Sequence, residues 1–342
     1  MELTTEQPEI IEKKRYLSID VFRGIAIVGM VFVNTIAEFD TVPWWSKHAI
    51  DFGLTYADLI APFFIFAISL TYTMSFRSSI KKDGYIQTYI KFIRRYAALL
   101  GFGFLGSIVI TPEGIHFGWA VLQAIGLAGI FTSFFILIPK YFRLALSFAF
   151  LFVYQFVLSL VVNIDGVLIS ISDLAYLSDH GGFIGGFGWG IMLLLCTSII
   201  DDFRERKILE ILIAGGIFSI FGVGLHLLWV YTGFPTYGGI SKIRVTQSYI
   251  LISIGIAMLL FCLIWFIYDK KQWTKNKSYF LSPYGKNALL LFILHPIFIG
   301  FSMLYMNDET HAILVALSAL LNVLILWGIA WWLNKKEIYI II

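Results

Sequence analysis

The chain has 342 residues, of which 59% are hydrophobic and only 14% are charged. A water-soluble fold must cover its exterior with polar groups, so this composition excludes an ordinary soluble domain. It predicts a protein that is embedded in a lipid bilayer and crosses it several times.

About ten apolar runs are long enough to cross a hydrocarbon core of roughly 30 Å. We therefore expect an all-α polytopic membrane protein, with residues 17–342 as one transmembrane domain after a polar tail, residues 1–16. Asp20 and Arg23 interrupt the first run, which we interpret as a retained helix and not a signal peptide. The expected spans are 20–39, 54–75, 90–110, 118–138, 141–162, 181–200, 208–230, 247–268, 287–305 and 312–334.

The basic residues fall on alternate connections between these runs. Of the 25 Lys and Arg residues, 22 lie on one side, and only Lys47, Lys242 and Arg244 lie on the other. The positive-inside rule then predicts that both termini are cytoplasmic. The opposite side is rich in carboxylates and would attract a protonated amine more than a polyanion, so no nucleic-acid partner is expected.

Three polar residues lie on one stripe of the first expected helix. At 100° per residue, Asp20, Arg23 and Asn34 fall within roughly 60° of one another. The stripe is about 21 Å long at 1.5 Å per residue. It is either an interfacial Asp20–Arg23 pair with Asn34 bonded to a neighbouring helix, or a polar path through the bundle.

The second expected helix begins inside the stretch KHAIDFGLTYADLIAPFFIF, residues 47–66. Thr55 can cap its start, and Asp58 lies in the first turn, where a carboxylate suits the helix dipole. Pro62 has no N–H for the carbonyl of Asp58, so that carbonyl loses its helical partner close to the membrane surface.

His48 precedes this helix, in the loop on the noncytoplasmic side. A single loop histidine is often a bystander, but this one lies close in sequence to Asp51 and Asp58, which we take as substrate-binding or structural candidates. Trp44 and Trp45, just before it, suit the aromatic belt at a membrane interface.

The ninth run contains a third group of polar residues. Lys286 and Asn287 are expected at its cytoplasmic mouth, and His295 lies about 12 Å deeper along a helix. An intramembrane histidine is a functional candidate, although a hydrogen-bonded structural histidine is an equal alternative.

Other signatures are absent from the sequence. No ATP-binding loop, zinc-protease motif or serine-hydrolase elbow is present, and no metal site is expected. Cys196 and Cys262 lie within apolar runs and are interpreted as packing residues. The glycine-rich run 181–190 predicts close helix packing.

Four motifs carry a resemblance to a known family. RYLSIDVFRGIAIVGMVFVN (residues 15–34) and KHAIDFGLTYADLIAPFFIF (47–66) together resemble the opening of the heparan-alpha-glucosaminide N-acetyltransferase family. WAVLQAIGL (119–127) resembles the LQRxG helix of that family, and GKNALLLFILH (285–295) resembles its late GxNxLxxYxxH segment.

The resemblance implies a membrane acyltransferase that takes acetyl from cytoplasmic acetyl-CoA and delivers it to a glucosamine amine across the membrane. It assigns His48 as the catalytic histidine, as general base or transient acyl carrier, and Asn34 as the residue that assists it. Both an acetyl-histidine intermediate and direct transfer are open. Four cations at the cytoplasmic mouth are expected to bind the CoA phosphates: Arg23, Arg94, Arg95 and Lys286.

The sequence departs from the family pattern at two places. The arginine of the LQR motif is Ala124, and the acidic DPEG-like segment is replaced by residues 179–182, Asp-His-Gly-Gly. The acceptor, amine or hydroxyl, is therefore left open within amino sugars and glycans. The alternative function is a transporter or flippase of a polar lipid or small solute. A plasma-membrane location is expected, and a homodimer is left open.

Overall fold

The computed structural model describes residues 16–112, 114–201, 203, 207–273 and 280–339. Within them the chain forms ten long helices and two short ones, α6 (Ile171–Tyr176) and α10 (Leu281–Lys286). The long helices are α1 (Leu17–Ile36), α2 (Ile60–Asp83), α3 (Tyr85–Gly106), α4 (Val121–Phe135), α5 (Lys140–Ser159), α7 (Gly182–Ile200), α8 (Ile208–Thr232), α9 (Gln247–Trp265), α11 (Ala288–Tyr305) and α12 (Ala312–Lys335).

Each of the ten predicted spans coincides with one of these helices, which confirms the all-α polytopic class. Eight helical segments of the described chain are long and apolar enough to cross a membrane. The other two are α4, which has only 15 residues, and α3, which carries Lys91, Arg94 and Arg95. The number of helices that cross the bilayer therefore stays a prediction.

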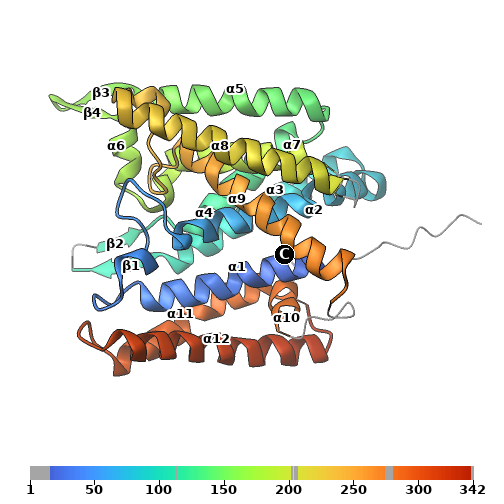
Figure 1. Cartoon of the computed structure of the whole chain (residues 1–342), viewed down its shortest axis with the longest axis vertical. Helices are drawn as coiled ribbons and strands as arrows, with labels where there is room; N and C mark the ends of the chain where they lie inside the picture. The colour runs from blue at the N-terminus through green and yellow to red at the C-terminus, as the bar shows by residue number, and fades with distance from the viewer. Residues whose placement is uncertain (1–15, 113, 202, 204–206, 274–279, 340–342) are drawn as a thin grey trace, which may run out of the picture.

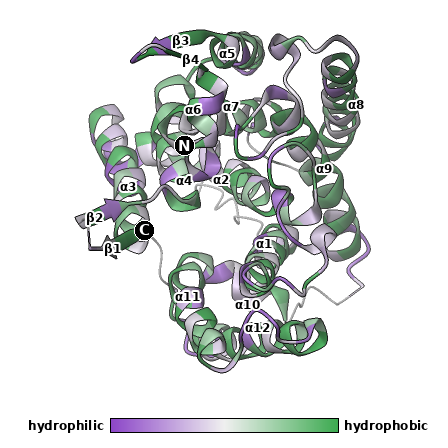
Figure 2. Cartoon of the chain, turned by 90° about the vertical axis from the view of Figure 1, so that its left-hand side faces the viewer, coloured by the Kyte–Doolittle hydropathy of each residue, from purple (hydrophilic) through white to green (hydrophobic). Residues whose placement is uncertain are grey.

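The long helices run roughly parallel to one another in layers (Figure 1). α5 and α8 lie along one edge of the bundle, α11 and α12 along the other, and α2, α4 and α9 between them. Seen from one end, the helices are mostly hydrophobic (Figure 2). Large apolar side chains on their outer faces are exposed, among them Leu209, Ile220 and Leu314, as a surface that faces lipid requires.

α7 forms the centre of the bundle and packs against α2, α4, α5 and α9. Nearly all of its side chains are buried. Its glycines allow this closeness, because a Cβ at Gly190 would meet the ring of Phe131 and one at Gly188 would meet Tyr154. The close packing predicted from the glycine-rich run is thus confirmed.

α1 and α10 approach each other through a reciprocal pair of glycines. A Cβ at Gly24 would collide with the carbonyl of Leu281, and a Cβ at Gly285 would collide with the carbonyl of Asp20. This backbone contact places Lys286, the last residue of α10, beside the first turns of α1.

Two β-hairpins were not predicted. β1 (Ile108–Thr111) pairs antiparallel with β2 (Gly114–Phe117), and β3 (Val161–Ile164) pairs with β4 (Val167–Ser170). The second hairpin turns through Asp165 and Gly166, both with positive φ, as a two-residue hairpin loop requires. Both hairpins lie at the same end of the bundle, here called the hairpin end (left in Figure 1).

The opposite end, here called the basic end, holds the start of α1 and the end of α12. The amides of Leu17 and Ser18 donate to the carboxylate of Asp269 at 2.9 and 3.1 Å, which caps α1. Tyr339, after α12, lines a cavity together with Asp20 and Lys286. Both ends of the described chain are therefore on one side, while the predicted tail, residues 1–16, lies almost wholly outside the described residues.

Orientation can be tested with two single cysteines. Asp40, whose side chain is 91% exposed, lies at the hairpin end, and the exposed Lys82 lies near the end of α2. In intact cells a membrane-impermeant maleimide should label Asp40→Cys at once and Lys82→Cys only after permeabilisation. The native Cys196 and Cys262 are buried and should give little background. The reverse labelling pattern would contradict a cytoplasmic basic end.

Candidate active site

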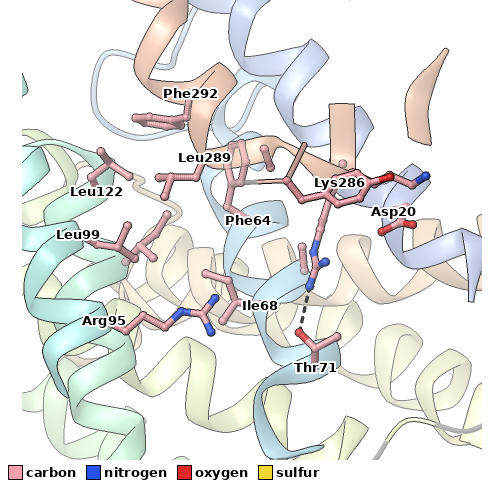
Figure 3. Close-up of a pocket in the computed structure, with 16 residues that line it drawn as sticks. Asp20, Phe64, Ile68, Thr71, Arg95, Leu99, Leu122, Lys286, Leu289 and Phe292 are labelled. Atoms are coloured by element: carbon pink, nitrogen blue, oxygen red, sulfur yellow. Dashed lines mark hydrogen bonds between the residues drawn. The ribbon is translucent and has the colours of Figure 1, made fainter. Parts of the chain in front are cut away.

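A cavity of about 460 Å³ opens at the basic end, between α1, α2, α3, α4 and the α10–α11 segment (Figure 3). Asp20 and Arg23, two of the three residues of the predicted stripe of α1, both line it. The lining residues are Asp20, Arg23, Phe64, Ala67, Ile68, Thr71, Arg95, Leu99, Leu122, Ile125, Gly285, Lys286, Ala288, Leu289, Phe292 and Tyr339.

Three of the four predicted cations line this cavity. Arg23 Nη2 donates to Thr71 Oγ1 at 3.0 Å, the bond drawn as a dashed line in Figure 3. Lys286 Nζ donates to Asn334 Oδ1 at 2.8 Å, and Arg95 reaches in from α3. Arg94, by contrast, is exposed and is not among the lining residues. The cavity thus combines cations from three helices that are far apart in sequence.

Deeper in, the cavity becomes apolar. Leu99, Leu122, Leu289 and Phe292 surround its inner part in Figure 3. A ligand with an anionic head and a long, mainly apolar arm would match this division, because the cations can pair with the head while the arm is kept out of water.

A second cavity, of about 70 Å³, lies toward the hairpin end. Phe64 and Phe292 line both cavities, and their rings meet edge to face with centroids 6.1 Å apart. This pair is here called the phenylalanine barrier. The second cavity is lined by Met30, Asn34, His48, Ala57, Ile60, Ala61, Phe64, Val121, His180, Lys242 and Phe292.

His48 lines the second cavity and is held from behind by Asp58. His48 Nδ1 lies 2.9 Å from Asp58 Oδ1, and the Asp58 side chain is 0% exposed. An ionised carboxylate can only accept, so Nδ1–H is the donor and Nε2 keeps its lone pair. The arrangement is that of a carboxylate–histidine pair whose imidazole is oriented to take a proton at Nε2.

Asp58 also organises the loop that carries His48. Its Oδ2 accepts from the amide of Thr55 at 2.9 Å and from the amide of Ala49 at 3.2 Å. A 3₁₀ turn (Tyr56–Leu59) begins directly after Thr55, as the predicted cap requires. The carbonyl of Asp58, which Pro62 deprives of its helical partner, accepts from Tyr249 Oη at 2.7 Å instead. Tyr249 of α9 therefore replaces the helical hydrogen-bond donor that Pro62 lacks.

Asn34 is oriented by His295, the histidine predicted near the bilayer midplane. His295 Nδ1 donates to the carbonyl of Phe292, which leaves Nε2 as the acceptor for Asn34 Nδ2 at 3.1 Å. His295 is 5% exposed. Of the two alternatives for His295, the structure thus contains the hydrogen-bonded histidine. Its bond orients the side chain of Asn34, which lines the second cavity.

Asp51, a predicted substrate-binding or structural candidate, lies in an ion pair. Arg244 donates from Nε and Nη2 to its two oxygens, each at 2.9 Å, and from Nη1 to Asp173 at 2.7 Å. This hydrogen bond holds the pKa of the Asp173 carboxyl below its ordinary value. Ser241 Oγ also donates to Asp51. Asp51 therefore fastens the His48 loop to the loop before α9, which favours the structural alternative.

Two residues of the second cavity were not predicted as site residues. Lys242 is 8% exposed, and burial lowers the pKa of its ammonium, an effect that the carboxylates of Asp58 and Asp179 partly oppose. His180 is half-buried, and its buried Nδ1 has no hydrogen-bond partner in the described structure. The sequence held one signal for Lys242, since it is one of only three basic residues on its side of the membrane.

The remaining candidate, Asn287, is the residue before α11; it is fully buried and does not line either cavity. Among the described residues, no group of three His, Cys, Asp or Glu side chains could hold a metal ion.

Residues 15–177 match the sequence model of a family described as heparan-alpha-glucosaminide N-acetyltransferase, catalytic. Two curated relatives carry the same name: the human protein is 41% identical over 68 residues, and the mouse protein is 32% identical over 100 residues. These matches cover 20% and 29% of this chain, and 10% and 14% of the respective relatives. The family match confirms the resemblance for residues 15–177, the part of the chain that carries Asn34 and His48.

The Arg244–Asp51 fork should be essential for the position of the His48 loop. Arg244→Lys keeps the charge but loses the bidentate geometry. We expect the free energy of unfolding to fall by about 1–3 kcal/mol, measured as a lower melting temperature in detergent. Lys47→Gln is the matched control, because its pair with Asp40 is exposed and worth at most about 1 kcal/mol. Equal melting temperatures for both variants would contradict this role.

Proposed function

We propose that this membrane protein, whose residues 15–177 match the catalytic region of heparan-alpha-glucosaminide N-acetyltransferases, transfers an acetyl group from acetyl-CoA to an amino sugar on the other side of the bilayer. The bilayer-spanning helices make it an integral, multi-pass protein.

One observation carries the proposal. A cavity lined by cations and a cavity lined by a carboxylate-bound histidine lie end to end, with only the phenylalanine barrier in common. An anionic donor and an amine acceptor can therefore enter from opposite ends and meet at one place. A reaction between molecules in two compartments requires such an arrangement.

The donor would bind at the basic end. Arg23, Arg95 and Lys286 are suited to the CoA phosphates through charge-assisted hydrogen bonds. The pantetheine arm would lie against the apolar part of the same cavity. Its thioester would then reach past Phe64 and Phe292 toward Asn34, which lines the cavity that the acceptor enters from the other end.

The chemistry would take place in the second cavity. A protonated amine is not a nucleophile, so His48 Nε2 accepts the amine proton while the nitrogen attacks the thioester carbonyl. Asp58 holds the imidazole in the required tautomer and stabilises the imidazolium that forms. Asn34 donates to the carbonyl oxygen as it becomes negative. An acetyl-histidine intermediate and direct transfer both use these groups.

The acceptor is the least constrained part of the proposal. Ala124, which replaces the arginine of the LQR motif, is fully buried in α4 and lines neither cavity. We infer an amino sugar or glycan, with nitrogen as the acceptor atom because the matched relatives are N-acetyltransferases by name. Transfer to oxygen and a homodimer are left open by the sequence, and a plasma-membrane location stays a prediction from it.

Two neighbouring arginines test the donor site. Arg95 lines the cavity and Arg94 does not, so Arg95→Gln should weaken CoA binding while Arg94→Gln should not. A lost charge-assisted hydrogen bond costs about 1.5–3 kcal/mol, roughly a 10- to 150-fold rise in Kd. Isothermal titration of purified protein with CoA measures it, and Lys286→Gln should behave like Arg95→Gln. An affinity for CoA equal to that of the wild type in all three variants would assign these cations to membrane anchoring.

The catalytic role of His48 is tested with protein reconstituted in liposomes, labelled acetyl-CoA and a panel of amino sugars. His48→Ala should lose about 10²–10⁴-fold in transfer and keep its affinity for CoA, because the histidine lies in the other cavity. Asp58→Asn should also lose most transfer, since a neutral amide no longer stabilises the imidazolium.

His116→Ala is the matched control, because His116 is an exposed histidine of β2, also at the hairpin end. It should transfer at the wild-type rate. If wild-type protein neither binds CoA nor acetylates any acceptor, the enzyme is ruled out. Solute uptake by the same liposomes that depends on Asp20 and Asn34 would then support the transporter.

A further inference from the structure

Lys242 is a charged residue of the second cavity for which the reaction above has no task. Its side chain lines the same space as His48 and Asn34 and is 8% exposed. Within the described part of the chain, its ammonium has no hydrogen-bond or ion-pair partner. Burial of a charge without a partner is costly, so a purely structural lysine is poorly explained at this position.

Asp58, whose charge acts on Lys242, does not supply that partner. The two oxygens of Asp58 accept from His48 Nδ1, the amides of Ala49 and Thr55, and Thr55 Oγ1. Asp58 is thus fully hydrogen-bonded without Lys242. The charges of Asp58 and Asp179 act on the ammonium, but within the described residues it donates a hydrogen bond to neither, so its N–H groups can bond to a group that enters the cavity.

The loop that carries Lys242 is fixed to the loop that carries His48. Ser241 Oγ and Arg244 both donate to Asp51, and the amide of Gly53 donates to the carbonyl of Ile240 at 2.9 Å. A β-bridge between Phe52 and Ser241 adds to this connection. The two loops that carry His48 and Lys242 are therefore held in a fixed relation, as a preorganised catalytic site requires.

We propose that Lys242 is a further catalytic residue, whose ammonium stabilises the negative charge on the tetrahedral intermediate. This inference rests on the proposed acetyl transfer. The acceptor nitrogen forms a bond to the thioester carbon, the π electron pair moves to the oxygen, and His48 Nε2 takes the proton. Collapse of the intermediate breaks the carbon–sulfur bond, and the proton passes from His48 to the leaving thiolate. The oxyanion that exists between the two steps faces Lys242.

Asn34 provides the second donor of this site. One N–H of its amide goes to His295 Nε2, which fixes the side chain and leaves the other N–H for the oxyanion. Asp58 is already committed to the imidazolium, so the oxyanion needs a positive charge of its own. Among the residues that line this cavity in the described structure, Lys242 is the one lysine, and none is an arginine.

The size of the cavity favours this role over recognition of an acidic group on the acceptor. Its volume of about 70 Å³ is well below the roughly 300–1,000 Å³ of pockets that enclose whole ligands. It has room for the reacting carbonyl and amine, and little for a carboxylate or sulfate some atoms away. Lys242 is therefore expected to act on the reacting atoms.

Lys242→Met tests the proposal in the full-length protein in liposomes. We expect kcat to fall about 10²–10³-fold, as for the loss of one oxyanion donor, with unchanged KM for a neutral amino sugar and unchanged Kd for CoA. Because the variant removes a buried charge that has no hydrogen-bond or ion-pair partner among the described residues, its melting temperature should equal or exceed that of the wild type. Lys242→Arg, which keeps the charge, should retain more activity than Lys242→Met.

Lys47→Gln is the matched control, since it removes a positive charge next to His48 from a side chain that does not line the cavity. It should leave kcat unchanged. A Lys242→Met protein that transfers at the wild-type rate would overturn the proposal, as would a loss of melting temperature that accounts for the loss of activity. So would a defect confined to the KM of a sulfated amino sugar, which would assign Lys242 to acceptor binding. Failure of the wild type to transfer acetyl would refute the proposed function itself.

Discussion

The buried carboxylate of Asp58 is the interaction on which the architecture of the hairpin end depends. It orients His48 and accepts the amides of Ala49 and Thr55. Its backbone carbonyl receives Tyr249 from α9. In a membrane protein each buried polar group must find its partner within the fold. One residue at the start of α2 therefore fixes the helix start, the preceding loop and the orientation of an imidazole at the same time.

The polar groups of the bundle fall into two sets on either side of the phenylalanine barrier. Cations of α1, α3 and α10 gather in the wider cavity, whereas imidazole, amide and ammonium groups gather in the narrower one. Phe292 connects the two sets, because its ring belongs to the barrier and its carbonyl accepts from His295, which in turn accepts from Asn34. Phe292 therefore belongs both to the wall between the cavities and to the hydrogen-bond chain that orients Asn34.

Much of the fold could be predicted from the sequence, because lipid imposes a strong and local requirement. Each apolar run coincided with a helix, and the stripe of Asp20, Arg23 and Asn34 on α1 faces both cavities. The cap at Thr55 was predictable from residue types within one turn. The hairpin at Asp165 and Gly166 was not predicted from apolar length, which does not distinguish a hairpin, although its two-residue turn is a strong local signal.

The sequence by itself determined the helices, the uneven distribution of basic residues between the two sides, and the motifs that contain Asn34 and His48. These features depend on neighbours along the chain. Only the tertiary structure decided which side chains meet. Asn34 and His295 are 261 residues apart, and Arg244 and Asp51 are 193 apart. It also separated Arg95 from Arg94 and brought Lys242 beside His48. Such pairings follow from how helices pack and loops cross, and packing contacts between distant segments leave no pattern in a single chain.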